Sequence, residues 1–197
     1  MEATAQAVAH PPTATGQPTL KVGFWTFLGS ETLFFGALIS TFLVYKHGSV
    51  SAPYAHQVIN IPLTSFSTFV LLMSSLCMVL ALAAVQHDSR RGALLWLFMT
   101  ALLGATFLGC QAYEFTSFYH EGLTLQSNLL GSTFFVLTGF HGAHVTMGVI
   151  WLLSLWFQTL SGRIGSADAL KVEVAGLYWH FVDIVWIVIF TVVYLLE

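Results

Sequence analysis

The sequence predicts an all-α, polytopic membrane protein with five transmembrane helices. Hydrophobic residues make up 56% of the 197-residue chain and charged residues only 8%, whereas about a quarter of the residues in soluble domains are charged. The mean hydropathy is +0.79. Long apolar segments alternate with short polar connections. This composition excludes a soluble domain, and a formal net charge of -3 gives no indication of nucleic-acid binding.

Each predicted helix is an apolar segment long enough to cross about 30 Å of hydrocarbon at about 1.5 Å per residue. In chain order the helices are Val22–Tyr45, Pro62–Gln86, Ala93–Tyr119, Asn128–Leu160 and Val172–Leu196. They are separated by connections that contain turn-forming or polar residues: HGSVSAPYAH, HDSRRG, HEGLTLQS and SGRIGSADALK. Residues 1–21 contain prolines and no apolar core, which predicts a disordered lead-in rather than a signal peptide. Residues 22–197 then form a single transmembrane domain.

The positions of Lys and Arg predict the orientation in the membrane. With five spans, one side of the membrane receives Lys21, Arg90, Arg91, Arg163 and Lys171, and the other side receives only Lys46. Connections that face the cytoplasm carry an excess of Lys and Arg. The asymmetry therefore predicts a cytoplasmic N-terminus and a C-terminus outside.

Several polar side chains fall inside the predicted spans, where lipid provides no water. Glu31 lies about 14 Å from the cytoplasmic end of the first span, at about 1.5 Å per residue. His141 and His144 lie near the centre of the fourth span, and His180 and Asp183 near mid-depth of the fifth. An Asp at the centre of a lipid-exposed helix costs about 2.5–3.5 kcal/mol. These side chains are therefore expected to face other helices, a polar cavity or lipid headgroups.

Helical spacing places several of these groups on common faces. One stripe of the fifth helix, at positions i, i+3, i+7 and i+10, contains Glu173, Gly176, His180 and Asp183. His141 and His144 share a face of the fourth helix by the same rule.

Small residues four positions apart occur in two spans. Gly139 with Ala143 forms such a pair in the fourth helix, and Ala105 with Gly109 in the third. Pairs of this kind allow helix backbones to approach closely in lipid. The alternative is that this spacing arises by chance in helices rich in Gly and Ala.

The buried polar groups have three interpretations on residue chemistry alone. A metal or haem site would use His141 and His144 with His180 and Asp183, although metal sites of helical bundles normally add Glu-x-x-His pairs and further carboxylates. The second interpretation is a proton-conducting chain that contains Glu31, His141, His144, His180 and Asp183. The third is structural polar packing, with or without a bound lipid.

Four motifs resemble those of subunit III of haem–copper oxidases. LLGSTFFVLTGFHGAHVTMG resembles the family hallmark STFF-x-x-TGFHG-x-HV-x-x-G, and VAGLYWHFVDIVWIVIF resembles its last helix. LGCQAYEF resembles its Q-x-x-E segment, and GSETLFFGALISTF its SE-x-x-FF segment. The motifs occur in family order from about Val22 onward. The chain has five spans rather than the seven of the mitochondrial type, so it is similar to the five-helix bacterial form.

The resemblance implies a non-catalytic subunit of a respiratory complex that reduces oxygen and pumps protons. Family members bind no haem or copper. They pack against the catalytic subunit I, with subunit II in the same complex, stabilise it and support proton uptake. The expected fold has two helix groups in a V-shaped bundle, with phospholipid in the cleft, in the bacterial plasma membrane. Cytochrome c and quinol oxidases both contain the five-helix form, so the electron donor stays open.

The resemblance also implies roles for individual residues. Glu31 corresponds to the family's intramembrane carboxyl group. The structural polar motif comprises His141, His144, Glu173, His180, Asp183, Gln111 and Glu114. The two hallmark histidines are then interior hydrogen-bonding groups, and no catalytic, cofactor or metal residue is expected in this chain. The alternatives are a subunit III-like component of a nitric oxide reductase and a membrane b-type haem electron carrier that uses His141 and His180.

Overall fold

The computed structural model describes residues 16, 18–48, 61–120 and 129–195. In this part of the chain the helices are α1 (Thr19–Gly48), α3 (Ile61–Gln86), α4 (Arg90–His120), α5 (Leu129–Leu160) and α6 (Ala169–Phe190). A 3-10 helix, η1 (Ser166–Asp168), precedes α6, and a π-helix, η2 (Thr191–Leu195), follows it. Among the described residues, 5 helices are long and apolar enough to cross a membrane. The predicted all-α fold with five spans is confirmed.

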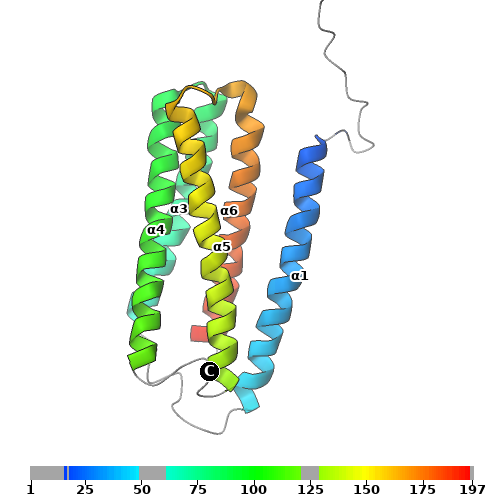
Figure 1. The fold of residues 1–197 in the computed structure, drawn as a ribbon, viewed down its shortest axis with the longest axis vertical. Helices are drawn as coiled ribbons and strands as arrows, with labels where there is room; N and C mark the ends of the chain where they lie inside the picture. The colour runs from blue at the N-terminus through cyan, green and yellow to red at the C-terminus, as the bar shows by residue number, and fades with distance from the viewer. Residues whose placement is uncertain (1–15, 17, 49–60, 121–128, 196–197) are drawn as a thin grey trace, which may run out of the picture.

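Consecutive helices run in opposite directions, and α3, α4, α5 and α6 pack together as one bundle (Figure 1). Helix α1 lies at the side of this bundle, mainly against α5 and α6. The predicted V-shaped arrangement of two helix groups is not confirmed, because α1 stands as a single helix beside one bundle. Most of the predicted lead-in, residues 1–21, lies outside the described residues, and α1 already begins at Thr19.

The bundle core is built around a tryptophan that lies between two glycines. A Cβ atom at Gly104 of α4 would lie 2.5 Å from the ring of Trp179 of α6, and a Cβ atom at Gly148 of α5 would lie 2.8 Å from the same ring. Trp179 is only 2% exposed, and its indole N–H donates to Ser74 of α3 at 2.9 Å. The absence of a side chain at both glycines therefore makes room for the ring.

Among the described residues, the two small-residue pairs have no close contact with another helix. A Cβ atom at Gly109 or Gly139 would meet nothing within 4 Å, and Ala105 and Ala143 are exposed. Within this chain the contacts favour the alternative of chance spacing, because these residues face outward from the described bundle. The spacing of small residues shows that they share a face, but it does not show which face meets another helix.

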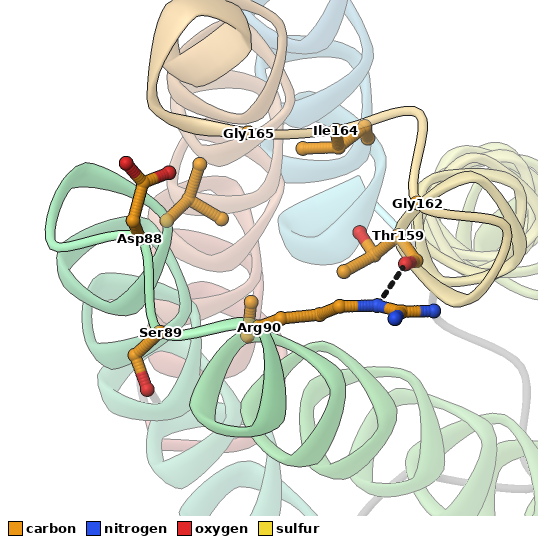
Figure 2. A pocket seen from close by; sticks show the side chains of 9 residues that line it. Asp88, Ser89, Arg90, Thr159, Gly162, Ile164 and Gly165 are labelled. Atoms are coloured by element: carbon orange, nitrogen blue, oxygen red, sulfur yellow. Dashed lines mark hydrogen bonds between the residues drawn. The ribbon is translucent and has the colours of Figure 1, made fainter.

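At one end of the bundle, hydrogen bonds join the α3–α4 connection to the α5–α6 connection. The Arg90 guanidinium donates to the carbonyl oxygens of Thr159 at 3.1 Å and Leu160 at 2.5 Å, where a cation stabilises the C-terminus of α5. The Asp88 carboxylate accepts hydrogen bonds from the backbone N–H and the hydroxyl of Ser166, both at 2.9 Å. Between these contacts lies a pocket of about 350 Å³, across which Arg90 reaches Thr159 (Figure 2). The α3–α4 and α5–α6 links are thus held as one surface.

The same end of the bundle holds most of the basic residues. It contains the start of α1, the α3–α4 link, the α5–α6 link and the start of α6 (Figure 1). These segments carry Lys21, Arg90, Arg91, Arg163 and Lys171. Lys46 is at the other end, where its ammonium group donates to the carbonyl oxygen of Val192 at 3.2 Å. The fold therefore places these residues on one side of the bundle, as the predicted orientation in the membrane requires.

Candidate functional site

Glu31 of α1 and His144 of α5 form a polar pair between two helices. Their side chains are 18% and 17% exposed, and Oε2 of Glu31 lies 3.1 Å from Nε2 of His144. The other ring nitrogen, Nδ1, lies 2.7 Å from the carbonyl oxygen of Phe140, one helical turn earlier in α5. Phe35 of α1 packs edge-on against the imidazole, with ring centroids 5.0 Å apart. An apolar ring thus covers one side of a polar contact between helices.

The hydrogen-bond pattern determines how many protons this pair holds. Because a carbonyl oxygen only accepts, the contact with Phe140 requires a hydrogen on Nδ1 of His144. The contact between Nε2 and Glu31 then requires one further proton, either on the imidazole or on the carboxyl group. The pair has no net charge in either arrangement. It therefore shares one proton and avoids placing an isolated charge in lipid.

His180 and Asp183 of α6 meet Ser75 of α3. The Ser75 Oγ atom lies 2.6 Å from Oδ2 of Asp183 and 3.2 Å from Nδ1 of His180. Asp183 is 5% exposed, and its Oδ1 atom is buried without a hydrogen-bond partner among the described residues. His180 is partly exposed. One hydroxyl group thus bridges a buried carboxyl group and a more accessible imidazole.

His141 is enclosed by aromatic rings. It is 0% exposed, stacks on Trp186 at a centroid distance of 4.8 Å and meets the edge of Phe107 at 5.9 Å. Neither ring nitrogen has a hydrogen-bond partner among the described residues. The two hallmark histidines therefore have different surroundings, although Phe35 packs against both. His141 and His180, the pair that a haem site would require, have different contacts: His141 meets aromatic rings, whereas His180 meets Ser75.

Gln111 and Glu114 of α4 connect that helix to its neighbours. The Gln111 amide donates to the carbonyl oxygen of Thr138 at 2.9 Å, and a Cβ atom at Gly142 would lie 2.7 Å from the Gln111 amide oxygen. Glu114 is 6% exposed and accepts hydrogen bonds from the hydroxyl of Thr64, at 2.8 Å, and from that of Tyr194. Glu114 thereby joins α3, α4 and η2 at the end of the bundle opposite the basic residues.

Glu173 does not join His180 and Asp183 in one cluster, although it shares their stripe. It forms an ion pair with Lys21, which links the N-terminal parts of α6 and α1. The five residues of the proposed proton chain also divide into separate groups: Glu31 with His144, His180 with Asp183, and His141 alone. Among the described residues, no three His, Cys, Asp or Glu side chains are arranged to hold a metal ion.

Sequence reasoning missed the hydroxyl groups that complete these contacts. On α3, Thr64, Thr68 and Ser75 bind Glu114, Trp186 and Asp183. The three hydroxyl residues lie at i, i+4 and i+11, which is the spacing of one helix face. This periodicity of hydroxyl residues in the second span could have predicted the contacts, because a buried Ser or Thr usually has a hydrogen-bond partner.

The chain is similar to known proteins over its whole length. Residues 1–197 match the family described as cytochrome c oxidase subunit III. The chain is 43% identical to the cytochrome c oxidase subunit 3 of Bacillus subtilis, over 89% of this chain and 85% of the relative. It is 39% identical to the quinol oxidase subunit 3 of the same species, over 89% of this chain and 86% of the relative. The cytochrome c oxidase subunit 3 of Alkalihalophilus pseudofirmus is 39% identical over 95% of this chain and 92% of the relative.

Proposed function

The chain belongs to the cytochrome c oxidase subunit III family, and we propose that it stabilises the catalytic subunit of its complex and supports proton uptake there. It is a multi-pass membrane protein and a subunit III of a haem–copper oxidase. The observation that supports a stabilising role is that its buried polar side chains make hydrogen bonds between helices. Gln111, Glu114 and Asp183 each bind a neighbouring helix. Such contacts hold the helices of a lipid-embedded bundle in one arrangement.

The partners that we propose are subunits I and II of the oxidase and membrane phospholipids. As a subunit 3, the chain is part of an oxidase complex. We propose that the partner subunits of this complex bind the haem and copper. Large apolar side chains face outward on α1, where Leu33 is 77% exposed and Trp25 is 56% exposed. Lipid tails or a partner helix are the surroundings that suit such a surface in the membrane. Because relatives include cytochrome c and quinol oxidases, the donor is left open.

Purification of the complex tests this function. A tagged chain is expected to bring with it a large subunit that carries haem and copper and reduces oxygen. The chain separated from that subunit is expected to be colourless and to retain no stoichiometric iron or copper. Deletion of the chain is expected to leave the metals in the large subunit but to shorten its active lifetime. A haem spectrum in the separated chain, or a large subunit that reduces nitric oxide instead, would refute the proposal.

The orientation that we propose has the N-terminus in the cytoplasm, in the bacterial plasma membrane. Reporter fusions are expected to place the start of the chain, Arg90 and Arg163 in the cytoplasm and the C-terminus outside. The reason is the excess of Lys and Arg at one end of the bundle. Moving Arg90 and Arg91 to the connection after α4 provides a control, since it is expected to weaken this orientation. A cytoplasmic C-terminus would contradict the prediction.

Glu31 is the group that we propose supports proton uptake, because the Glu31–His144 pair shares one proton at a partly exposed position. A hydrophobic carbodiimide reacts with protonated carboxyl groups within reach of the membrane. Labelling is expected at Glu31 in preference to Glu114, which is buried, and Glu173, which is paired with Lys21. Mass spectrometry of the labelled chain measures this preference.

The Glu31→Gln variant tests whether this proton matters for turnover. Its amide keeps a donor for His144 but cannot release a proton. We expect oxygen reduction linked to proton uptake to fall several-fold in the intact complex. The Thr32→Ser variant on the same helix turn serves as a control and is expected to turn over normally. An unlabelled Glu31 together with unchanged pumping in Glu31→Gln would assign the pair to structure alone.

A further inference from the structure

The cluster of Ser75, His180 and Asp183 lacks the charge balance that an ionised aspartate needs. Among the described residues, the Asp183 carboxyl group has one hydrogen-bonding contact, between its Oδ2 atom and Ser75 Oγ, and its Oδ1 atom is buried without a partner. An ionised carboxylate only accepts hydrogen bonds and has room for several. With its second oxygen unsatisfied, the charged form is therefore strongly disfavoured in this position.

The charged and titratable groups on the helices around α6 do not supply the missing charge. They are engaged elsewhere: Glu31 with His144, Glu173 with Lys21, Glu114 with Thr64 and Tyr194, Lys46 with Val192, and Tyr178 with the His144 carbonyl. His141 is enclosed by aromatic rings, and Cys77 is a buried thiol on α3. The nearest ionisable partner that the contacts show is His180, which Ser75 connects to Asp183.

We propose that Ser75, His180 and Asp183 form a proton-binding site, in which Asp183 is a neutral carboxylic acid that exchanges its proton through Ser75 and His180. In the resting arrangement the Asp183 hydroxyl donates to Ser75 Oγ, and the Ser75 hydroxyl donates to Nδ1 of His180. The Oδ1 atom, which has no hydrogen-bond partner among the described residues, is then the carbonyl oxygen of the acid. This oxygen carries no proton and no ionic charge. This arrangement satisfies both hydroxyl groups with the distances that the structure shows.

Transfer along this path conserves protons and charges. The Asp183 hydroxyl proton moves to Ser75 Oγ as the Ser75 proton moves to Nδ1 of His180. Asp183 is then a carboxylate that accepts from Ser75, and His180 is an imidazolium. This path requires water to reach Nε2 of His180 from the membrane surface, and loss of the Nε2 proton to this water leaves neutral His180 and a vacant proton site on Asp183. Because His180 is partly exposed and Asp183 is buried, the imidazole is the side of the cluster through which protons enter and leave.

The test is a measurement of the protonation of Asp183 in the full chain in lipid nanodiscs. Only the aspartate side-chain carboxyl groups are labelled with 13C, and infrared or NMR spectra distinguish acid from carboxylate. The other aspartates are Asp88, which accepts from Ser166, and Asp168, which pairs with Lys171. Near pH 7 we expect an acid signal from one aspartate. It is expected to disappear in Asp183→Asn and to persist in the Asp88→Asn, Asp168→Asn double variant, which keeps Asp183 alone.

The relay through Ser75 is tested by hydrogen–deuterium exchange of the same acid signal. In Ser75→Ala the signal is expected to remain but to exchange several-fold more slowly, whereas in Ser65→Ala, at an exposed position of α3, it exchanges as in the wild type. A purely structural cluster would show no such difference. Carboxylate signals from all three aspartates near pH 7 would overturn the proton site, and unchanged exchange in Ser75→Ala would overturn the relay.

Discussion

Addition of a single methyl group at Gly104 is expected to destabilise the bundle more than most surface substitutions. In Gly104→Ala the new Cβ atom would lie 2.5 Å from the Trp179 ring and 3.0 Å from Val149. The Trp179 ring has little room to move, because Trp179 is 2% exposed and its N–H is held by Ser74. Overpacking of a close-packed interior costs about 1–3 kcal/mol, and we expect the upper part of that range. Gly148→Ala, which approaches other atoms of the same ring, is expected to behave similarly.

Matched controls come from the outward-facing glycines of the same helices. Gly109→Ala on α4 and Gly139→Ala on α5 place a Cβ atom where nothing lies within 4 Å. These variants are expected to retain wild-type stability or to gain from the higher helix propensity of Ala. The free energy of unfolding of the purified chain in mixed detergent micelles measures all four variants. Equal effects at Gly104 and Gly109 would contradict the proposed packing of Trp179.

Removal of the indole ring at position 186 is expected to have the largest effect of all single substitutions considered. Trp186 is 1% exposed, stacks on His141 and meets Phe107 edge-on, with a centroid distance of 4.8 Å for each ring pair. Its N–H donates to Thr68 of α3 at 2.9 Å. Trp→Ala substitutions in protein cores cost about 3–5 kcal/mol. In lipid the loss comes from packing and the hydrogen bond rather than from transfer to water, so we expect about 3 kcal/mol.

Two further variants separate the contributions to the Trp186 effect. Trp186→Phe keeps an aromatic ring beside His141 but loses the donor to Thr68, and it is expected to show an intermediate loss. Trp25→Ala removes the same side chain from a position that is 56% exposed on α1, and it is expected to change the stability of the isolated chain little. The same unfolding measurement applies. A loss in Trp25→Ala as large as in Trp186→Ala would contradict the assignment of Trp186 to the core.

The separation of the polar groups changes how this subunit is understood. The structure divides the candidate proton chain into a pair at the α1–α5 contact, a cluster at the α3–α6 contact and an isolated histidine. Each of the two hydrogen-bonded groups joins a carboxyl group to an imidazole, directly in Glu31–His144 and through a hydroxyl in Asp183–Ser75–His180. These contacts form two local hydrogen-bonded groups rather than one continuous path, and each group is a proton site only in the proposals above.

The sequence by itself determined the class of the protein, its five spans and its family. Those features depend on composition, on the length of apolar segments and on contiguous motifs, all of which are local properties of the chain. It also identified Glu31, His144, His180 and Asp183 as groups that need partners, because charged groups in lipid are costly wherever they lie. The interpretation of both hallmark histidines as interior hydrogen-bonding groups followed from the family resemblance, and among the described residues only His144 of the two has hydrogen-bond partners.

Only the tertiary structure decided which partner each group has. Ser75 joined Asp183, Lys21 joined Glu173, and Trp179 filled the space left by Gly104 and Gly148. The physical reason is helix rotation: a period of about 3.6 residues shows which residues share a face, but packing against several neighbours sets where that face points. For the same reason, the spacing of Gly109 and Gly139 did not show that these residues face outward. In a bundle that is apolar on all sides, no polar face marks the direction of lipid.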